Sequence, residues 1–395
     1  CNQGSDLNVL KKPNIILILA DDMGYGDLAI QNSESKIPTP NLDQLARDGM
    51  RFTDAHSPSA VCTPTRYSIL TGRYSWRSRL QKGVLWEWDR PLIEEGRITI
   101  AQLLKDAGYV TALIGKWHLG WNWPTKNNIA PGRGDTGEKV DFDQPIGGGP
   151  TSVGFDYYFG DDVPNFPPYA FIENDRVTAM PTVLKPDAMF GVKGVMVEDW
   201  QFSNVMPTLK NKAIQFIEAA AQQEDKKPFF LYLSLTAPHT PIAPAKRFLG
   251  KSGAGAYGDF VYQVDQTVGD ILDALENTNQ DKNTLVVFSS DNGSPARSGE
   301  NMNGDTGSVR SYGHNPSRPW RGIKGDAWEG GHRVPFIARW PASIAKGNVN
   351  NEAVTLTDLM ATFAEVAHVE LPNDTAEDSL SLLPVLSGNK LEGPL

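Results

Sequence analysis

The sequence predicts an α/β fold in which helices cover both faces of a large, mostly parallel mixed sheet. The main observation is that short apolar runs of strand length alternate with segments of helical periodicity along most of the chain. This alternation is typical of parallel strands joined by helical crossovers. The second observation is size, because 395 residues with 40% hydrophobic side chains are enough for a large core and a smaller appendage.

Four apolar runs are predicted to be buried strands, and each is followed by polar residues that can do chemistry. The runs cover residues 14–20, 110–115, 229–235 and 284–290. The polar residues that follow them are Asp21 and Asp22, Lys116 and His118, His239, and Asp291 and Asn292. Ligands of open α/β sheets bind beyond the carboxyl ends of the strands. We therefore expect a site where these residues meet.

Helical patterns lie between the strands and supply the crossovers. They cover residues 41–50, 100–107, 209–221 and 257–275, and Thr99 is the expected N-cap of the second. Two segments, 121–171 and 294–320, are instead rich in glycine, proline and aspartate. Long irregular segments in a compact domain are usually functional loops.

Composition excludes two classes of function. A net charge of −10 and a pI near 5.2 argue against an electrostatic nucleic-acid binder. No apolar run approaches the ~20 residues that cross a bilayer. The two cysteines, Cys1 and Cys62, exclude a disulfide framework.

The start of the chain resembles the mature end of a bacterial lipoprotein, with residues 1–12 as a polar tether and Cys1 as the lipid-bearing residue. This implies a lipid anchor and a location in the periplasm or at the cell surface. An arbitrary chain boundary is the alternative. Mass spectrometry of the natively expressed protein distinguishes the two, since an unmodified N-terminus contradicts the anchor.

A short helix is predicted to begin at Cys62. Pro64 suits its first turn and Gly72 suits the position just after its end. Arg66 falls on the same side of this helix as Cys62, and the free N–H groups of a helix N-terminus attract anions. An anionic ester could therefore meet Cys62 and a cation together. Taken alone, however, a cysteine is usually a core residue.

The run Cys62-Thr63-Pro64-Thr65-Arg66, followed by Thr71-Gly72-Arg73, resembles the C-x-P-x-R signature of type I sulfatases, members of the alkaline phosphatase superfamily. The resemblance implies an alkaline phosphatase-like fold. It also implies that a formylglycine-generating or anaerobic sulfatase-maturing enzyme oxidises Cys62 to formylglycine, whose aldehyde hydrate is the nucleophile. Similar motifs run from residue 14 to about 388 and include Gly330-Gly331-His332-Arg333-Val334-Pro335.

The residues at the predicted strand ends resemble the metal ligands of this family. Asp21, Asp22, Asp291 and Asn292 offer oxygen donors, which favour calcium or magnesium over zinc. Each of them alone would be read as a turn or cap residue. The resemblance implies a calcium site that these four residues complete together with modified Cys62.

The resemblance also assigns catalytic roles. A sulfate monoester is a poorly electrophilic anion, so its oxygens must be neutralised and its departing alkoxide protonated. Calcium with Arg66, Lys116 and Lys324 would neutralise the sulfate. By resemblance, His239 with Lys324 would assist the leaving alcohol, and His118 would take the proton that allows sulfate to be expelled.

The sequence departs from the family in two places. Where many members carry a sulfate-contacting serine, this chain continues Asp161-Asp162-Val163-Pro164-Asn165, so Asn165 or a neighbouring aspartate is the expected replacement. The chain also stops at Leu395, before most of the small C-terminal subdomain that these enzymes usually have. We expect residues 13–345 to form the α/β catalytic domain and 346–395 to form its end and the start of a truncated subdomain.

The leading hypothesis is a calcium-dependent sulfatase, a sulfuric ester hydrolase that acts on a sulfated carbohydrate. Aromatic and basic loop residues are candidates for sugar binding, with loop packing as the alternative for the tryptophans. They are Trp121, Trp123, His314, Arg318 and Trp320. Two other hypotheses stay open: a phosphonate or phosphate monoester hydrolase of the same superfamily, and a non-catalytic protein that binds sulfated glycans.

Overall fold

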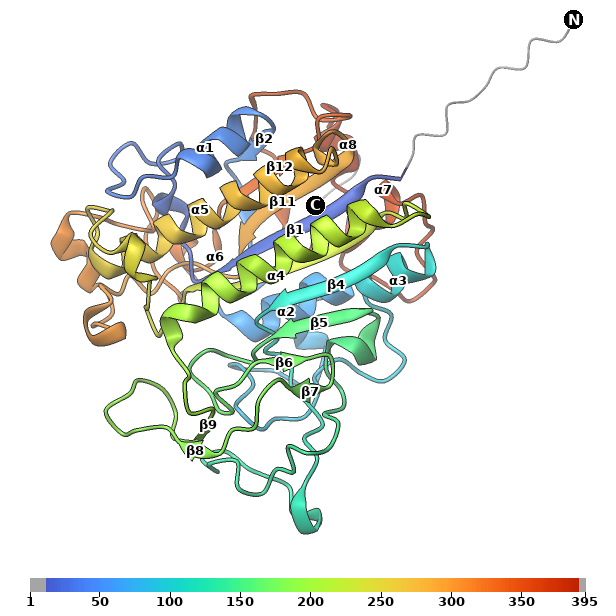
Figure 1. Cartoon of the computed structure of the whole chain (residues 1–395). Helices are drawn as coiled ribbons and strands as arrows, with labels where there is room; N and C mark the ends of the chain where they lie inside the picture. Colours follow the sequence, from blue (N-terminus) through green and yellow to red (C-terminus); the bar gives the residue numbers. More distant parts are fainter. Residues whose placement is uncertain (1–11, 391–395) are drawn as a thin grey trace, which may run out of the picture.

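The computed structural model describes residues 12–390 as one ten-stranded mixed sheet with helices on both faces (Figure 1). The predicted tether and Cys1 lie outside the described residues. The strand order is β13-β2-β12-β11-β1-β10-β4-β5-β6-β7. The predicted α/β fold with a large, mostly parallel mixed sheet is confirmed.

The centre of the sheet consists of five parallel strands, four of which coincide with the predicted apolar runs. They are β1 (Asn14–Asp21), β4 (Val110–Gly115), β5 (Tyr157–Gly160), β10 (Phe229–Pro238) and β11 (Thr284–Ser290). β1 lies between β10 and β11 and pairs with both in parallel. The carboxyl ends of β1, β10 and β11 therefore meet at one edge of the sheet.

Short strands flank this parallel centre. On one side, β12 (Phe336–Arg339) and β2 (Met50–Phe52) pair antiparallel, and β13 (Asn348–Asn350) pairs in parallel with β2. On the other side, β6 (Ile172–Glu173) and β7 (Arg176–Val177) are antiparallel. Two further pairs are separate from the main sheet: β3 (Ala55–His56) with β14 (Val354–Thr355), and β8 (Val183–Leu184) with β9 (Val195–Met196).

The side chains of β1 show why the sheet is buried on both faces. Ile15, Leu17 and Leu19 belong to one core cluster, and their neighbours Ile16 and Ile18 belong to another, as the two-residue period of a strand requires. A strand buried on both faces reads as a continuous apolar run. This is the reason that these strands could be recognised in the sequence.

Helices cover each face of the sheet. α1 (Pro40–Arg47), α4 (Phe202–Gln222) and α5 (Gly255–Asn277) pack on one face, and α2 (Cys62–Thr71), α3 (Ile100–Asp106) and α7 (Leu359–Val366) pack on the other (Figure 1). α6 (Glu329–His332) and α8 (Leu383–Leu386) are single turns. The side chain of Thr99 accepts a hydrogen bond from the Gln102 N–H, so the predicted N-cap is confirmed.

Two helix boundaries differ from prediction by three residues or more. The helix predicted at 41–50 ends at Arg47 because Met50 begins strand β2. The helix predicted to begin at 209 begins at Phe202 and continues through Pro207, a residue that usually signals a helix boundary.

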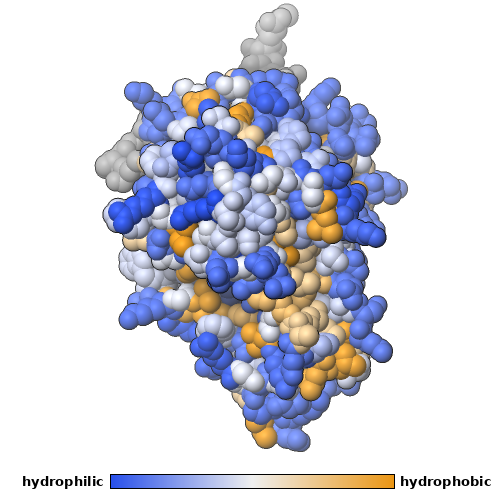
Figure 2. Space-filling view, turned by 90° about the vertical axis from the view of Figure 1, so that its left-hand side faces the viewer, coloured by the Kyte–Doolittle hydropathy of each residue, from blue (hydrophilic) through white to orange (hydrophobic). Residues whose placement is uncertain are grey.

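Among the described residues, no helix is long and apolar enough to cross a membrane. On the face shown in Figure 2 the surface is largely hydrophilic, and apolar side chains gather mainly in the lower half.

Candidate active site

The predicted nucleophile lies at the first residue of α2, at the edge where the central strands end. Val61 is the N-cap and no side chain caps the helix. Gly72 ends it with a left-handed φ of +64°, a conformation that glycine adopts without strain. Cys62 is 2% exposed. The sequence prediction of a short helix that begins at Cys62 is confirmed.

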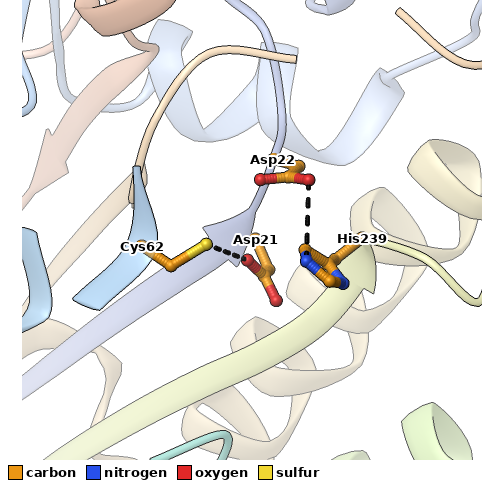
Figure 3. Close-up of side chains that lie close together, drawn as sticks. All are labelled: Asp21, Asp22, Cys62 and His239. Atoms are coloured by element: carbon orange, nitrogen blue, oxygen red, sulfur yellow. Dashed lines mark hydrogen bonds and ion pairs between the residues drawn. The ribbon is translucent and has the colours of Figure 1, made fainter. Parts of the chain in front are cut away.

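Four acidic and metal-ligating side chains converge there from three elements (Figure 3). Cys62 comes from α2, Asp21 and Asp22 from the end of β1, and His239 follows β10. One ligand atom of each lies within 4.8 Å of the others. Asp22 has a φ of +71°, a conformation that non-glycine residues adopt at a cost and that is common at functional sites.

Two lysines flank the nucleophile position. The Lys324 Nζ lies 3.3 Å from the Cys62 Sγ and 2.6 Å from Asp22 Oδ1. The Lys116 Nζ lies 2.8 Å from Asp21 Oδ2, and neither of those side chains is exposed. The Asp21 Oδ1 lies 3.7 Å from the Cys62 Sγ. Both lysines are therefore held within the same cluster as Cys62.

Arg66 is one turn after Cys62 and is 1% exposed. Its guanidinium donates to Asp291 Oδ2 at 2.8 and 3.1 Å and to the Ser234 Oγ at 2.5 Å. A buried cation is stable only when it is paired in this way. Arg66 is thus a fixed internal cation, as expected from its place on the same side of the helix as Cys62.

The oxygen donors of Asp291 and Asn292 complete the cluster. Asp291 Oδ1 accepts from the Asp22 N–H at 3.1 Å, and Asn292 Nδ2 donates to Asp22 Oδ1 at 2.7 Å. The Asn292 Oδ1 is buried and has no hydrogen-bond partner. A buried oxygen without a hydrogen-bond partner next to buried carboxylates suits a hard cation, so these residues fit a divalent metal.

The cluster perturbs the titration of its members. Burial raises the pKa of the Asp21 carboxyl, but Lys116, His239 and Arg66 outweigh it and lower that pKa to about 2. Burial raises the pKa of the Cys62 thiol to about 12 although Lys116 and Lys324 oppose it. Because the thiolate is the reactive form of cysteine, unmodified Cys62 is a poor nucleophile in this environment.

One ring nitrogen of His118 carries a lone pair and has no hydrogen-bond partner. Its Nε2 donates to the Leu85 carbonyl at 3.0 Å, so its buried Nδ1, which has no partner, carries the lone pair. Burial and then the charge of Lys116 lower the pKa of His118 well below its ordinary value. The imidazole is therefore neutral near pH 7, with the lone pair of Nδ1 available.

The sulfatase family model matches residues 13–369 of the chain. The chain belongs to the sulfatase family. It is 34% identical to the N-acetylgalactosamine-6-O-sulfatase of Bacteroides thetaiotaomicron, over 96% of this chain and 77% of that protein. It is 33% identical to the mouse N-acetylgalactosamine-6-sulfatase, over 97% of this chain and 68% of that protein.

A solved structure from the glycosaminoglycan metabolism of Bacteroides thetaiotaomicron superposes on this chain with a TM-score of 0.81. The two chains are 32% identical, and the match covers 95% of this chain and 82% of the other. The chain is accordingly a sulfuric ester hydrolase with the alkaline phosphatase-like fold, and the relatives named here act on sulfated carbohydrates. The phosphatase and non-catalytic alternatives are not favoured.

The structure buries both of the tryptophans that were predicted to bind sugar in this sulfatase. Trp121 is 1% exposed and Trp123 is 8% exposed, and they pack against each other and against Trp117, Trp88 and Tyr158. Trp121 also donates to Asp162 Oδ1 at 3.1 Å. The prediction that these rings stack on a sugar is corrected to loop packing, because no open face remains.

His314 is also a structural residue rather than a substrate contact. Its Nε2 lies 2.8 Å from Asp27 Oδ1 and neither side chain is exposed. Arg318 remains exposed and pairs with Glu34 at 2.5 Å. The ring of Trp320 lies under the Arg333 guanidinium at 4.0 Å. None of these contacts involves the catalytic cluster.

Asn165 stays a prediction as a sulfate or sugar contact. It is half-buried, and its Oδ1 is buried without a hydrogen-bond partner. The next residue, Phe166, lies edge-on to the His118 ring, with 6.1 Å between ring centroids. Asn165 is thus next in sequence to a residue whose ring lies beside the His118 ring.

Two residues position catalytic side chains of the sulfatase site: Ser234, which was missed in the sequence, and Asp162, which was considered there only as a sulfate contact. Ser234 accepts from Arg66 and donates to the Lys116 carbonyl at 2.7 Å. Asp162 accepts from the His118 N–H at 3.1 Å. Ser234 is a polar residue inside the apolar run of β10, and Asp162 follows the end of β5. A polar residue inside an apolar strand and an acidic residue just after a strand end are the sequence features from which these two roles could have been predicted.

Proposed function

We propose that this sulfatase removes the 6-sulfate of an N-acetylgalactosamine residue in a sulfated glycan, and that formylglycine made from Cys62 is its nucleophile. The observation that carries the catalytic part is the position of Cys62, which lies 3.3 Å from the Lys324 Nζ at the uncapped start of a buried helix. The sugar is supported by the relatives, since proteins at 33–34% identity are N-acetylgalactosamine-6-sulfatases.

The conversion of Cys62 needs a maturing enzyme as a partner, because the thiol supplies no aldehyde. When formed, the aldehyde hydrate supplies an oxygen nucleophile at the start of α2. Lys324 is held protonated, because the Asp22 carboxylate raises its pKa above the ordinary value and outweighs the opposing effect of burial. Lys324 can therefore donate a proton toward the departing sugar oxygen.

The remaining residues hold charge and move a proton. Arg66 and Lys116 are buried cations aimed at the cluster, which favours a bound sulfate over water. The His239 Nδ1 donates to the Thr240 carbonyl at 2.5 Å, so its Nε2 carries the lone pair and faces the cluster. His118, neutral and with a free Nδ1, accepts the proton released as sulfate leaves.

We propose calcium as the metal because every strand-end ligand offers oxygen. Asp21, Asp22, Asp291 and Asn292 would hold the ion, which when bound neutralises sulfate oxygens. The unpartnered Asn292 Oδ1 is the specific support for this assignment.

Chelation followed by calcium addition tests the metal. In calorimetric titrations we expect one calcium to bind, and Asn292→Ala to weaken it on the order of tenfold or more, because a ligand oxygen is lost. Asn389→Ala is the matched control, since Asn389 is exposed and far from the cluster in sequence. Calcium binding that is identical in both variants contradicts the assignment.

A substrate panel tests the sugar and the reaction type together. We expect sulfate release from 6-sulfated N-acetylgalactosamine to exceed that from the 4-sulfated sugar, because the position of the ester must match the leaving-group pocket. We also expect a nitrophenyl sulfate to be cleaved in preference to the matching nitrophenyl phosphate. Preference for the phosphate would restore the phosphatase alternative, and preference for the 4-sulfate would refute the proposed position.

A further inference from the structure

A second group of metal-ligating side chains lies outside the catalytic cluster. His56 ends strand β3, and Glu329 and His332 are the first and last residues of α6. One ligand atom of each lies within 4.8 Å of the others. All three side chains are half-buried, and none was assigned a role in catalysis.

The hydrogen bonds of the two histidines fix where their protons are. The His56 Nε2 lies 2.7 Å from Asp54 Oδ1, an oxygen that Arg333 also contacts, and a carboxylate paired with arginine can only accept. The His332 Nε2 lies 3.3 Å from the Ala327 carbonyl oxygen, which also can only accept. Both Nε2 atoms therefore carry hydrogens, and in neutral imidazoles both Nδ1 atoms carry lone pairs.

These two Nδ1 atoms face each other at a distance of 3.0 Å. Two lone pairs at that distance repel unless a cation or an added proton lies between them. A tetrahedral zinc with bonds of 2.0–2.1 Å separates its ligand nitrogens by about 3.3 Å. An opening of roughly 0.3 Å would therefore place both Nδ1 atoms on one zinc ion.

The surroundings match those of a protein zinc site. A ligating histidine usually donates its other ring N–H to a carboxylate or a carbonyl, as His56 does to Asp54 and His332 to Ala327. Glu329 is bonded by Arg333 through Oε2, and among residues 12–390 no group donates to its Oε1. That oxygen can serve as the third ligand.

A fourth position is reached from a cavity of about 740 Å³ that both histidines line. Asp326 and Asp358 line the same cavity, and their carboxyl groups favour cations over anions there. Imidazole nitrogens select zinc and similar transition metals over calcium. We propose that His56, His332 and Glu329 bind one zinc ion, with the fourth position open to water from the cavity.

This ion would join the two segments that carry catalytic residues. β3 leads into the N-terminus of α2, which begins with Cys62, and α6 follows the loop that carries Lys324. The two segments already share backbone hydrogen bonds, from Ser57 N–H to the His332 carbonyl at 2.7 Å and from Gly325 N–H to the Ala60 carbonyl at 2.9 Å. Zinc would add a second, stronger connection.

Metal titration of the full chain tests the site independently of catalysis. The Cys62→Ser variant, kept in excess calcium, is used throughout so that the active-site thiol cannot bind zinc. We expect one equivalent of Zn²⁺ by calorimetry, and one of Co²⁺ with the visible absorption of tetrahedral cobalt. Adding His56→Ala or His332→Ala should weaken zinc on the order of tenfold or more.

His368→Ala is the matched control, because His368 is exposed and outside the group. Equal zinc affinity in this control and in the His56→Ala and His332→Ala variants overturns the proposal, as does the absence of stoichiometric binding, which would leave a shared proton between the rings. If either variant fails to fold, anomalous diffraction at the zinc edge from zinc-soaked crystals decides. A peak between the two Nδ1 atoms supports the site, and no peak there overturns it.

Discussion

Replacing Cys62 by alanine or serine is expected to abolish sulfate release while the chain stays folded. The loss should reach a factor on the order of 10⁵–10⁶, as the loss of a covalent nucleophile does in other hydrolases. The serine variant tests the mechanism more specifically than the alanine variant. Its hydroxyl could be sulfated, but it lacks the second hydroxyl of an aldehyde hydrate and so has no route to expel the product.

Sulfate release under saturating 6-sulfated N-acetylgalactosamine measures this effect, and circular dichroism checks the fold. Ser68→Ala is the matched control, because Ser68 lies on the same helix, is equally buried and bonds only the Pro64 carbonyl. Activity of either Cys62 variant within tenfold of the wild type would refute the role of Cys62.

His118→Ala is expected to lower kcat by about 10²–10⁴-fold, the usual contribution of a general base. The change should appear in kcat more than in KM, because the proton moves only in the transition state. The Nδ1 of His118 is the lone-pair nitrogen, and burial lowers the pKa of the ring so that it is unprotonated. No neighbouring side chain bonds that nitrogen and could take its place.

Steady-state kinetics of His118→Ala beside His368→Ala measure the effect. His368 is exposed, so the His368→Ala variant is the control for any general effect of removing an imidazole. A kcat loss of less than tenfold for His118→Ala, with the fold intact, would mean that another group accepts the proton.

The central strands were predictable because they are buried on both faces. Residues 14–20 and 284–290 form continuous apolar runs, and such runs leave a signal that the flanking β2 or β6, with two or three residues each, cannot. The antiparallel β12 was missed for the same reason. The helix boundaries were predicted less well, because residues such as Pro207 lie inside a helix although proline usually marks a helix boundary.

The catalytic cluster was predictable because the carboxyl ends of parallel strands share one edge. Asp21, Asp291 and His239 are far apart in sequence, yet they follow β1, β11 and β10, which are neighbours. No comparable rule predicts from the sequence where the side chains of loops lie. Trp121 and His314 were predicted to bind sugar, and their burial follows from contacts with Tyr158 and Asp27 that only the folded chain reveals.

Cys62 is the proposed source of the nucleophile, and the most direct test of this role relates activity to the conversion of Cys62 to formylglycine. Protein prepared with different amounts of maturing enzyme is analysed by peptide mass spectrometry, which separates formylglycine from cysteine at position 62. The rate of sulfate release from 6-sulfated N-acetylgalactosamine is measured on the same samples. We predict a rate proportional to the converted fraction and zero without conversion. Full activity in protein that retains cysteine at position 62 would contradict the account.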